Sequence, residues 1–291
     1  MSKVAIVTDS NSGITQKQGQ ELGVAVVPMP VLIDDKIYFE DVDLTREEFY
    51  RRLQSEISLT TSTPSPASVT DTWNAVLKEH DSIVYIPMTS SLSSSCEYAI
   101  ALAAEYDGKV QVVDNIRISI TQRQSVLDAL NMATEGMDAI SIKKHLEETK
   151  LDASIYIMVD TLKYLKRGGR VTAAGAAIGE VLNIKPVLQI QGGKLDAYAK
   201  SRGKKAAKQV MIEAIKADIE KRFQSLYDEG RLEICAAYTG VDDCIAEAES
   251  WRQQIQGAFP AHNIWMDPLS LSVASHIGPG ALAIACCRRY K

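Results

Sequence analysis

Short runs of valine and isoleucine recur along the first half of the chain, separated by amphipathic segments. Each run is about four residues long and is apolar throughout, which is typical of strands buried on both faces of a parallel sheet. The runs lie at 4–7, 24–27, 83–86 and 110–113. Strands that alternate with helices predict an α/β fold with a doubly wound parallel sheet in this half of the chain.

The segments between these runs carry helix-start signals. Two have the spacing of a capping box, and a third places a capping residue before a proline. They are Thr15 with Gln18, Thr45 with Glu48, and Ser65 before Pro66. We expect a helix to begin at each, the third running toward residue 80.

The pattern changes near residue 153, where strands and helices no longer alternate regularly. We expect strands at 153–159, 232–238, 263–266 and 281–286, helices at 172–182, 204–227 and 241–256, and a hairpin from 186–190 and 195–199 around Gly192-Gly193. A hairpin among strands and helices predicts a mixed sheet. The sequence therefore predicts two α/β domains, residues 1–150 and 151–291.

Composition narrows the class of protein. The chain has 291 residues, 46% hydrophobic and 24% charged, with a formal charge of −5. The acidic balance disfavours a nucleic-acid partner or an anionic membrane surface. Five cysteines without a CxxC pair, no signal-peptide pattern and no apolar run of about 18–20 residues predict a cytoplasmic protein without a transmembrane segment.

Two stretches rich in hydroxyl groups precede predicted helices. Residues 89–95 follow the strand at 83–86 and lead into a helix expected at 93–106, so their hydroxyls and free N–H groups would lie at the ligand-binding edge of the sheet. Residues 60–66 run in the same way into the helix start at Ser65. Each stretch alone is more typical of a simple helix cap than of a site, and two of them in one sheet domain favour a site. Without a nearby cation or metal ligand, they suit a carboxylate better than a triphosphate.

Two further stretches combine glycines with cationic or titratable side chains. Residues 165–170 read Leu-Lys-Arg-Gly-Gly-Arg, where three cations would grip a phosphate or an acidic partner, or would simply complete a helix C-terminus. His276 lies in Ser-His-Ile-Gly-Pro-Gly, a rigid context that would fix its ring, although a lone histidine is often structural. The standard nucleotide, cofactor, protease and metal motifs are missing, so we expect no cofactor and no metal.

Taken in order, these stretches resemble the DegV family. The resemblance runs through the sequence Val-Thr-Asp-Ser at 7–10, then 61–66, 90–93, 165–170, 182–186 and 276–280, and so covers essentially the whole chain. It implies two α/β domains that bury a long-chain fatty acid. It also implies a carrier, itself not an enzyme, that presents the acyl carboxylate to a separate ATP-dependent fatty acid kinase subunit.

The resemblance also assigns site residues. Thr61, with Ser62 beside it, and Ser93 match the family's carboxylate-binding hydroxyls, and Arg170 and His276 match the arginine and histidine near that carboxylate. The chain departs from the pattern at 94–96, where Ser-Ser-Cys replaces the usual Gly-Thr-Tyr, so the acyl-chain preference stays open. Two alternatives remain, an autonomous phosphotransfer enzyme related to dihydroxyacetone kinase and a regulator.

Overall fold

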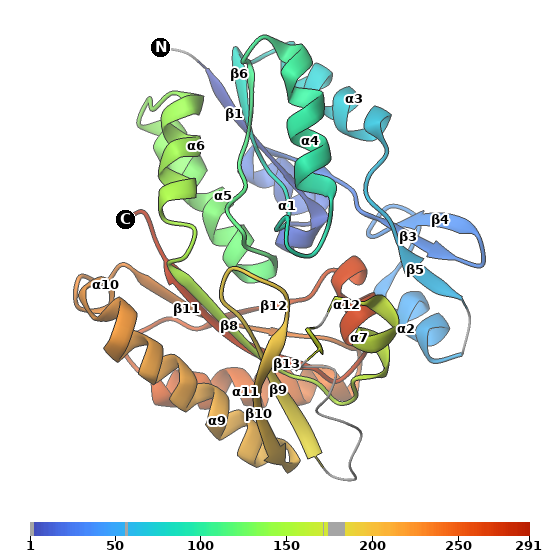
Figure 1. Ribbon diagram of the computed structural model, residues 1–291, viewed down its shortest axis with the longest axis vertical. Helices are drawn as coiled ribbons and strands as arrows, with labels where there is room; N and C mark the ends of the chain where they lie inside the picture. Colours follow the sequence, from blue (N-terminus) through green and yellow to red (C-terminus); the bar gives the residue numbers. More distant parts are fainter. Residues whose placement is uncertain (1–2, 56–57, 171, 174–183) are drawn as a thin grey trace.

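The computed structural model describes residues 3–55, 58–170, 172–173 and 184–291. The amino-terminal half of the chain forms one large sheet and the carboxyl-terminal half forms a second, which lies below the first in Figure 1. The first sheet is parallel and the second is mixed, so the predicted fold class is confirmed.

The parallel sheet has the strand order β2-β1-β6-β7. Its strands are β1 (Val4–Asp9), β2 (Val24–Val27), β6 (Ser82–Ile86) and β7 (Val110–Val112), all at the predicted valine and isoleucine runs. One face packs against α1 (Gln16–Leu22), α5 (Ser119–Thr134) and α6 (Ala139–Glu148), and the other against α3 (Pro66–Val76) and α4 (Ser95–Ala103). Helices on both faces explain why these strands are apolar throughout.

The mixed sheet has the order β10-β9-β8-β13-β11-β12, in which β11 and β12 run parallel and the other neighbours antiparallel. Its strands are β8 (Ala153–Met158), β9 (Ile184–Ile190), β10 (Asp196–Arg202), β11 (Leu232–Tyr238), β12 (Trp265–Pro268) and β13 (Leu282–Arg288). The predicted hairpin is confirmed as β9 and β10.

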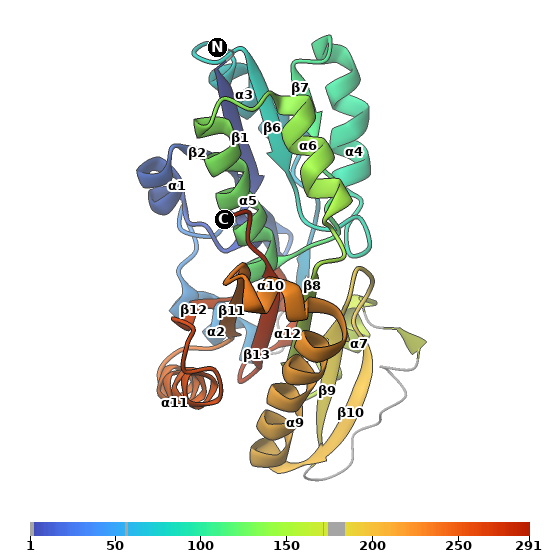
Figure 2. The same ribbon diagram turned by 90° about the vertical axis from the view of Figure 1, so that its left-hand side faces the viewer.

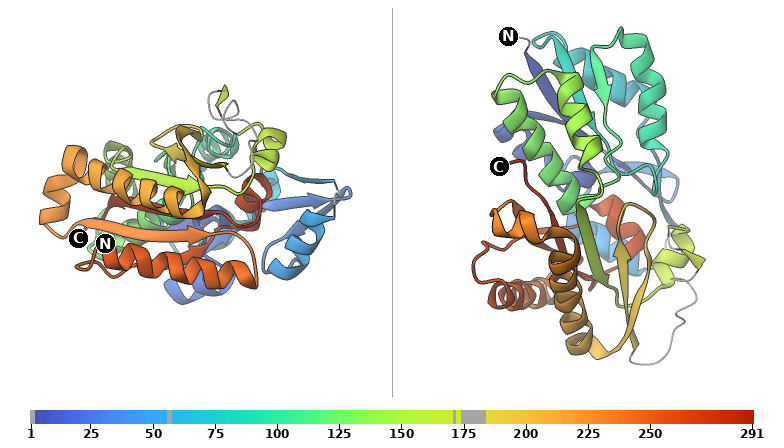
Figure 3. Two further views of the ribbon diagram at one scale, coloured as in Figure 1. Left: turned by 90° about the horizontal axis from the view of Figure 1, so that it is seen from below. Right: turned by 60° about the vertical axis from the view of Figure 1, so that its left-hand side comes forward.

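Helices cover one face of the mixed sheet. They are α9 (Gly203–Asp218), a π-helical turn η3 (Ile219–Phe223), α10 (Gln224–Asp228) and α11 (Asp243–Ala258). Figure 3 shows α9 and α11 along this outer face. The inner face looks toward the carboxyl ends of the parallel strands (Figure 2).

A small third sheet was not predicted. It contains β3 (Pro30–Ile33), β4 (Lys36–Phe39) and β5 (Leu59–Thr61), antiparallel in the order β4-β3-β5. β4 and β5 are short and partly exposed, so they lack the continuous apolar runs that marked the strands of the parallel sheet. The helices α2 (Arg46–Gln54), α7 (Lys163–Gly168) and α12 (Leu271–Ile277) gather beside it (Figure 1). Thr61, which the sequence placed only in a run into the helix start at Ser65, ends the strand β5.

The helix starts were predicted better than the helix ends. Thr15 and Gln18 form both arms of a capping box, and Ser65 caps α3 before Pro66. However, α3 ends at Val76 rather than near residue 80, and α4 begins at Ser95 and passes at 104–106 into a short 3-10 turn, η2. The small-residue helix expected at 172–182 falls largely outside the described residues. Within the described ranges, no helix is long and apolar enough to span a bilayer.

Candidate functional site

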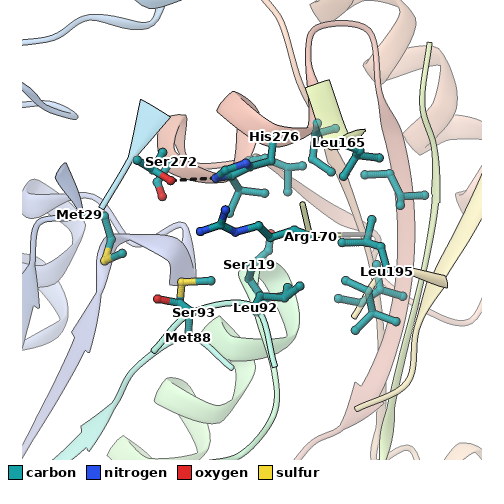
Figure 4. Close-up of a pocket in the computed structure, with 18 of the residues that line it drawn as sticks. Met29, Met88, Leu92, Ser93, Ser119, Leu165, Arg170, Leu195, Ser272 and His276 are labelled. Atoms are coloured by element: carbon teal, nitrogen blue, oxygen red, sulfur yellow. Dashed lines mark hydrogen bonds between the residues drawn. The ribbon is translucent and has the colours of Figure 1, made fainter. Parts of the chain in front are cut away.

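A cavity lies between the inner face of the mixed sheet and the carboxyl ends of the parallel strands. It encloses about 940 Å³ of empty space, part of it open to solvent. All five residues singled out from the sequence line it, namely Thr61, Ser62, Ser93, Arg170 and His276. Figure 4 shows the last three of them. These five residues come from both halves of the chain, so the cavity brings together segments that are far apart in the sequence.

The polar end of the cavity is held together by a contact between distant segments. Oγ1 of Thr61 lies 2.8 Å from Nε2 of His276, although the two residues are 215 positions apart in the sequence. Thr61 comes from the end of β5 and His276 from the last turn of α12. Which atom donates the hydrogen bond depends on the imidazole tautomer. The contact brings a hydroxyl and an imidazole to one point of the cavity wall.

The two glycines of residues 165–170 have separate structural roles. A Cβ added at Gly168 would lie 2.1 Å from Nδ1 of His276, so only glycine lets the end of α7 approach this ring. Gly169 adopts φ 66° and ends α7 in the left-handed conformation that glycine adopts without strain. The chain then turns and carries Arg170 into the cavity, which explains why a cation can follow a helix end and still line a pocket.

The electrostatics of the polar end favour an anion. Burial, with added repulsion from Arg170 and Arg167, lowers the pKa of His276 to about 4. The imidazole is therefore neutral near pH 7, and the positive charge is carried by the Arg170 guanidinium, which points into the space between His276 and Ser93 (Figure 4). A carboxylate placed there would meet one fixed cation and several neutral hydrogen-bonding groups.

Ser93 lies in the turn before α4, on the other side of the cavity. Its Oγ is 2.7 Å from Oγ of Ser95 and accepts a hydrogen bond from the Ser95 N–H at 3.2 Å. Ser94 occupies the N-cap position but makes no capping hydrogen bond with its side chain. The first N–H groups of α4 thus lie beside the cavity lining, where the positive end of the helix dipole supplements Arg170.

The rest of the cavity is apolar, and its floor is the inner face of the mixed sheet. Alternate residues of a strand face opposite sides, so Ile155 and Ile157 of β8 point inward while Tyr156 packs against the outer helices. Across the sheet, Ala283 pairs with Ile157 on one side and with Ala237 on the other. Two short side chains beside a tall one leave a depression in this floor.

The opposite wall comes from loops that follow the parallel strands. Met88 and Leu92 lie after β6, and Ile118 and Ile120 lie where α5 begins. All four side chains are at most 9% exposed, so this wall, like the floor, is shielded from solvent. The cavity is therefore amphipathic, with cation, imidazole and hydroxyls at one end and hydrocarbon over the remainder.

Known proteins share the whole of this architecture. A family model described as "Uncharacterised protein, DegV family" matches residues 3–289. The chain belongs to the DegV family. A DegV domain-containing protein of Deinococcus radiodurans is 30% identical over 97% of both chains.

Two solved structures are also similar to this DegV chain. One is a DegV family protein from Thermus thermophilus described as showing fatty acid binding, with a TM-score of 0.86, 30% identity, and coverage of 98% of this chain and 99% of that one. The other is DegV, a fatty acid binding protein from Bacillus subtilis, with a TM-score of 0.84, 26% identity, and coverage of 99% and 100%.

The DegV stretch at 7–10 does not line the cavity but supports it. Asp9 is fully buried, and its carboxylate accepts hydrogen bonds from the N–H groups of Met88 at 2.7 Å and Asn11 at 2.9 Å, and from Nε2 of Gln122 at 3.1 Å. Burial raises the pKa of Asp9 to about 6. One carboxylate thus fixes the backbone of Met88 at the cavity wall and ties it to α5.

Two polar lining residues were missed from the sequence. Ser119 begins α5 with φ 55°, and Ser272 lies in the first turn of α12. Neither belongs to a recognisable motif, and α12 itself was not predicted. Ser272 is buried at 7% exposure, so its presence at the cavity depends on where a seven-residue helix packs, and the local sequence does not determine that.

Proposed function

We propose that this protein binds one long-chain fatty acid per chain in the cavity between its sheets. The carboxylate lies at Thr61, Ser62, Ser93, Arg170 and His276, and the acyl tail lies over the inner face of the mixed sheet. The observation that carries this proposal is the division of a single cavity into a cationic, hydrogen-bonding end and an apolar remainder. The two related proteins described as binding fatty acids support the same ligand class.

The energetics favour a ligand with a long tail. Each buried methylene contributes about 0.8 kcal/mol, so a long acyl chain supplies most of its own binding free energy. The carboxylate is costly to bury unless it is paired and hydrogen-bonded. Arg170 supplies a planar pair of donors, and the hydroxyls of Thr61 and Ser93 supply further ones, which lowers that cost.

Titrations with ligands that differ either in the head group or in the length of the tail test this proposal. Palmitate, its methyl ester and octanoate are titrated into protein freed of lipid, and heat or displacement of a fluorescent probe is measured. We expect one palmitate per chain, an ester at least about tenfold weaker because it brings no charge to Arg170, and a much weaker octanoate. Equal affinity for acid and ester would show that the polar end is unused.

We further propose that the protein is a cytoplasmic carrier rather than an enzyme. It presents the bound carboxylate to a separate ATP-dependent fatty acid kinase subunit, which forms the acyl phosphate. Residues 1–150 form one domain that supplies the hydroxyls, and residues 151–291 form a second domain that closes the pocket and supplies Arg170 and His276. The contact between Thr61 and His276, one residue from each half, supports this division of the site.

Reconstitution tests the carrier role. Loaded protein, radiolabelled ATP and a matched kinase subunit are combined, each also being left out in turn. Acyl phosphate is expected only in the complete mixture. Product from the loaded protein and ATP alone would instead establish an autonomous phosphotransfer enzyme.

A further inference from the structure

A strained segment connects β7 to α5 and forms part of the cavity wall. Ile116 has φ 49° and Ser119 has φ 55°, and neither is glycine. Such residues rarely adopt the left-handed conformation, least of all a β-branched one, and they keep it only where the surroundings hold them. Because Ile118, Ser119 and Ile120 line the cavity, whatever holds this segment also sets the shape of the cavity.

Arg117 links this segment to its surroundings. It is 4% exposed, and its guanidinium donates from Nη1 to Oγ of Ser125 at 3.1 Å and from Nη2 to the backbone oxygens of Thr149 at 2.9 Å and Asp152 at 3.4 Å. Its Nε is buried without a hydrogen-bond partner among the described residues. These hydrogen-bond partners are neutral, and the guanidinium also interacts electrostatically with the buried carboxyl of Asp128. Burying an arginine remains costly, so a nonpolar residue would be expected here if packing were the sole requirement.

Arg117 is hydrogen-bonded to three parts of the structure that surround the cavity. Thr149 and Asp152 lie in the connection from α6 to β8, the strand whose Ile155 forms part of the floor. The backbone oxygen of Arg117 also accepts a hydrogen bond at 2.9 Å from the N–H of Thr89, the first residue of the 89–95 stretch that carries Ser93. One buried residue thus joins the wall, the loop of the polar end and the connection to the floor.

We propose that Arg117 is a positioning residue that slows the release of the bound fatty acid. The proposal rests on the proposed function. Movement of the wall away from the floor would widen the way out for a long tail, and any such movement between 116–120 and 149–152 breaks the hydrogen bonds of this guanidinium to Thr149 and Asp152. Arg117 does not line the cavity, so it acts on the ligand only through Ile118, Ser119 and the Ser93 loop.

The test compares two arginines that bind the same connection. Arg222, in η3 beside the outer helices, donates to the backbone oxygen of Leu151 at 2.7 Å and to Oγ of Ser154 at 2.7 Å, and it forms an ion pair with Asp218. Among the described residues, none of these contacts reaches the cavity wall. Arg117→Met and Arg222→Met are loaded with palmitate, and release to an acceptor vesicle is followed by stopped flow. We expect release to quicken by at least about tenfold in Arg117→Met and by less than about twofold in Arg222→Met.

The outcomes separate this proposal from the one on which it rests. Equal acceleration in both variants would mean that the arginines merely stabilise the connection, and an unchanged rate in Arg117→Met would also overturn the inference. If Arg117→Met does not fold, Ser125→Ala removes one partner alone. We expect this variant to release palmitate about two- to fivefold faster than wild type, and an unchanged rate would contradict the proposal. Wild-type protein that takes up no palmitate would overturn the proposed function as well.

Discussion

The two ends of the cavity are built in different ways. The apolar floor consists of neighbouring strands, and the pairing of Ile157 with Ala283 and of Ala283 with Ala237 follows directly from the strand register. The polar end is assembled from segments far apart in the sequence, joined where Thr61 meets His276. A sheet fixes its own side chains through a backbone ladder, whereas the polar end depends on how β5, α7 and α12 pack together. The floor should therefore govern how tightly a tail is held, and the polar end should govern orientation and chemistry.

Replacing Arg170 or His276 should have the largest effect, and the loss should be greater in phosphoryl transfer than in lipid retention. Each of Arg170→Ala and His276→Ala should still carry fatty acid yet yield roughly 100-fold less acyl phosphate with a matched kinase. The reason is that electrostatic stabilisation matters most as negative charge builds up in the transition state. Bound lipid by extraction and product by radiolabel transfer are measured on the same preparations. Loss of lipid in proportion to product would contradict this division between binding and chemistry.

Filling the floor should weaken binding next most strongly. Ala283→Leu places a branched side chain in the depression and excludes the volume of about three methylenes, which corresponds to about 2.4 kcal/mol, or roughly sixtyfold in palmitate affinity. The control is Ile284→Val, the next residue of β13, which faces the outer helices. It should lower the free energy of unfolding by about 1 kcal/mol without changing affinity. A similar loss of affinity in both variants would show that the sheet, not the depression, matters.

Removing one hydroxyl at the polar end should have a moderate effect. Ser93→Ala should weaken palmitate binding by about 1–2 kcal/mol, or roughly five- to thirtyfold, through a lost hydrogen bond to a buried charge. The matched control is Ser65→Ala, which also removes a hydroxyl at a helix start, because Ser65 caps α3 and does not line the cavity. Ser65→Ala should cost about 1 kcal/mol of stability and leave affinity unchanged. If the two variants bind palmitate equally well, Ser93 serves only as part of the turn.

The effect of pH falls on the stability of the folded state rather than on palmitate affinity. The unfolded chain protonates His276 near pH 6.5 and the folded chain only near pH 4, so this residue makes the folded state less stable as pH falls through that window. Asp9 acts in the opposite direction, since burial raises its pKa to about 6 and its contribution is lost as pH rises toward that value.

Urea unfolding of ligand-free protein separates the two contributions. Because His276→Gln removes the first contribution and keeps the second, the stability of wild type relative to His276→Gln should fall by roughly 2–3 kcal/mol as pH falls from 6.5 to 4. A difference that stays constant over this range would mean that the imidazole is not held neutral.

The sequence predicted the floor better than the polar end, for physical reasons. Strands such as β8 and β13 show their burial in runs of apolar residues, and those runs depend little on the rest of the chain. The elements that carry the polar end are short, and neither the three residues of β5 nor the seven of α12 were predicted. Thr61 and His276 were found through their motifs and the family resemblance instead. Their hydrogen bond arises from tertiary packing, which no local pattern encodes.

Residues without a motif were missed for the same reason. Arg117 lies in an ordinary-looking stretch, and its burial becomes evident only when the connection at 149–152 lies beside it. Asp9 was noted as part of the resemblance, but its task of holding the backbone of Met88 required the parallel sheet to place β1 beside β6. Residues that support a site without lining it are thus the hardest to predict from sequence patterns.

The most direct test of the central claim is to ask what the protein carries when it is purified. Freshly isolated protein is denatured and extracted with organic solvent, and the extract is quantified by mass spectrometry beside that of Ala283→Leu prepared in the same way. We expect about one long-chain fatty acid per wild-type chain and markedly less bound fatty acid in Ala283→Leu. An extract without fatty acid, from protein that also fails to take up added palmitate, would contradict the claim.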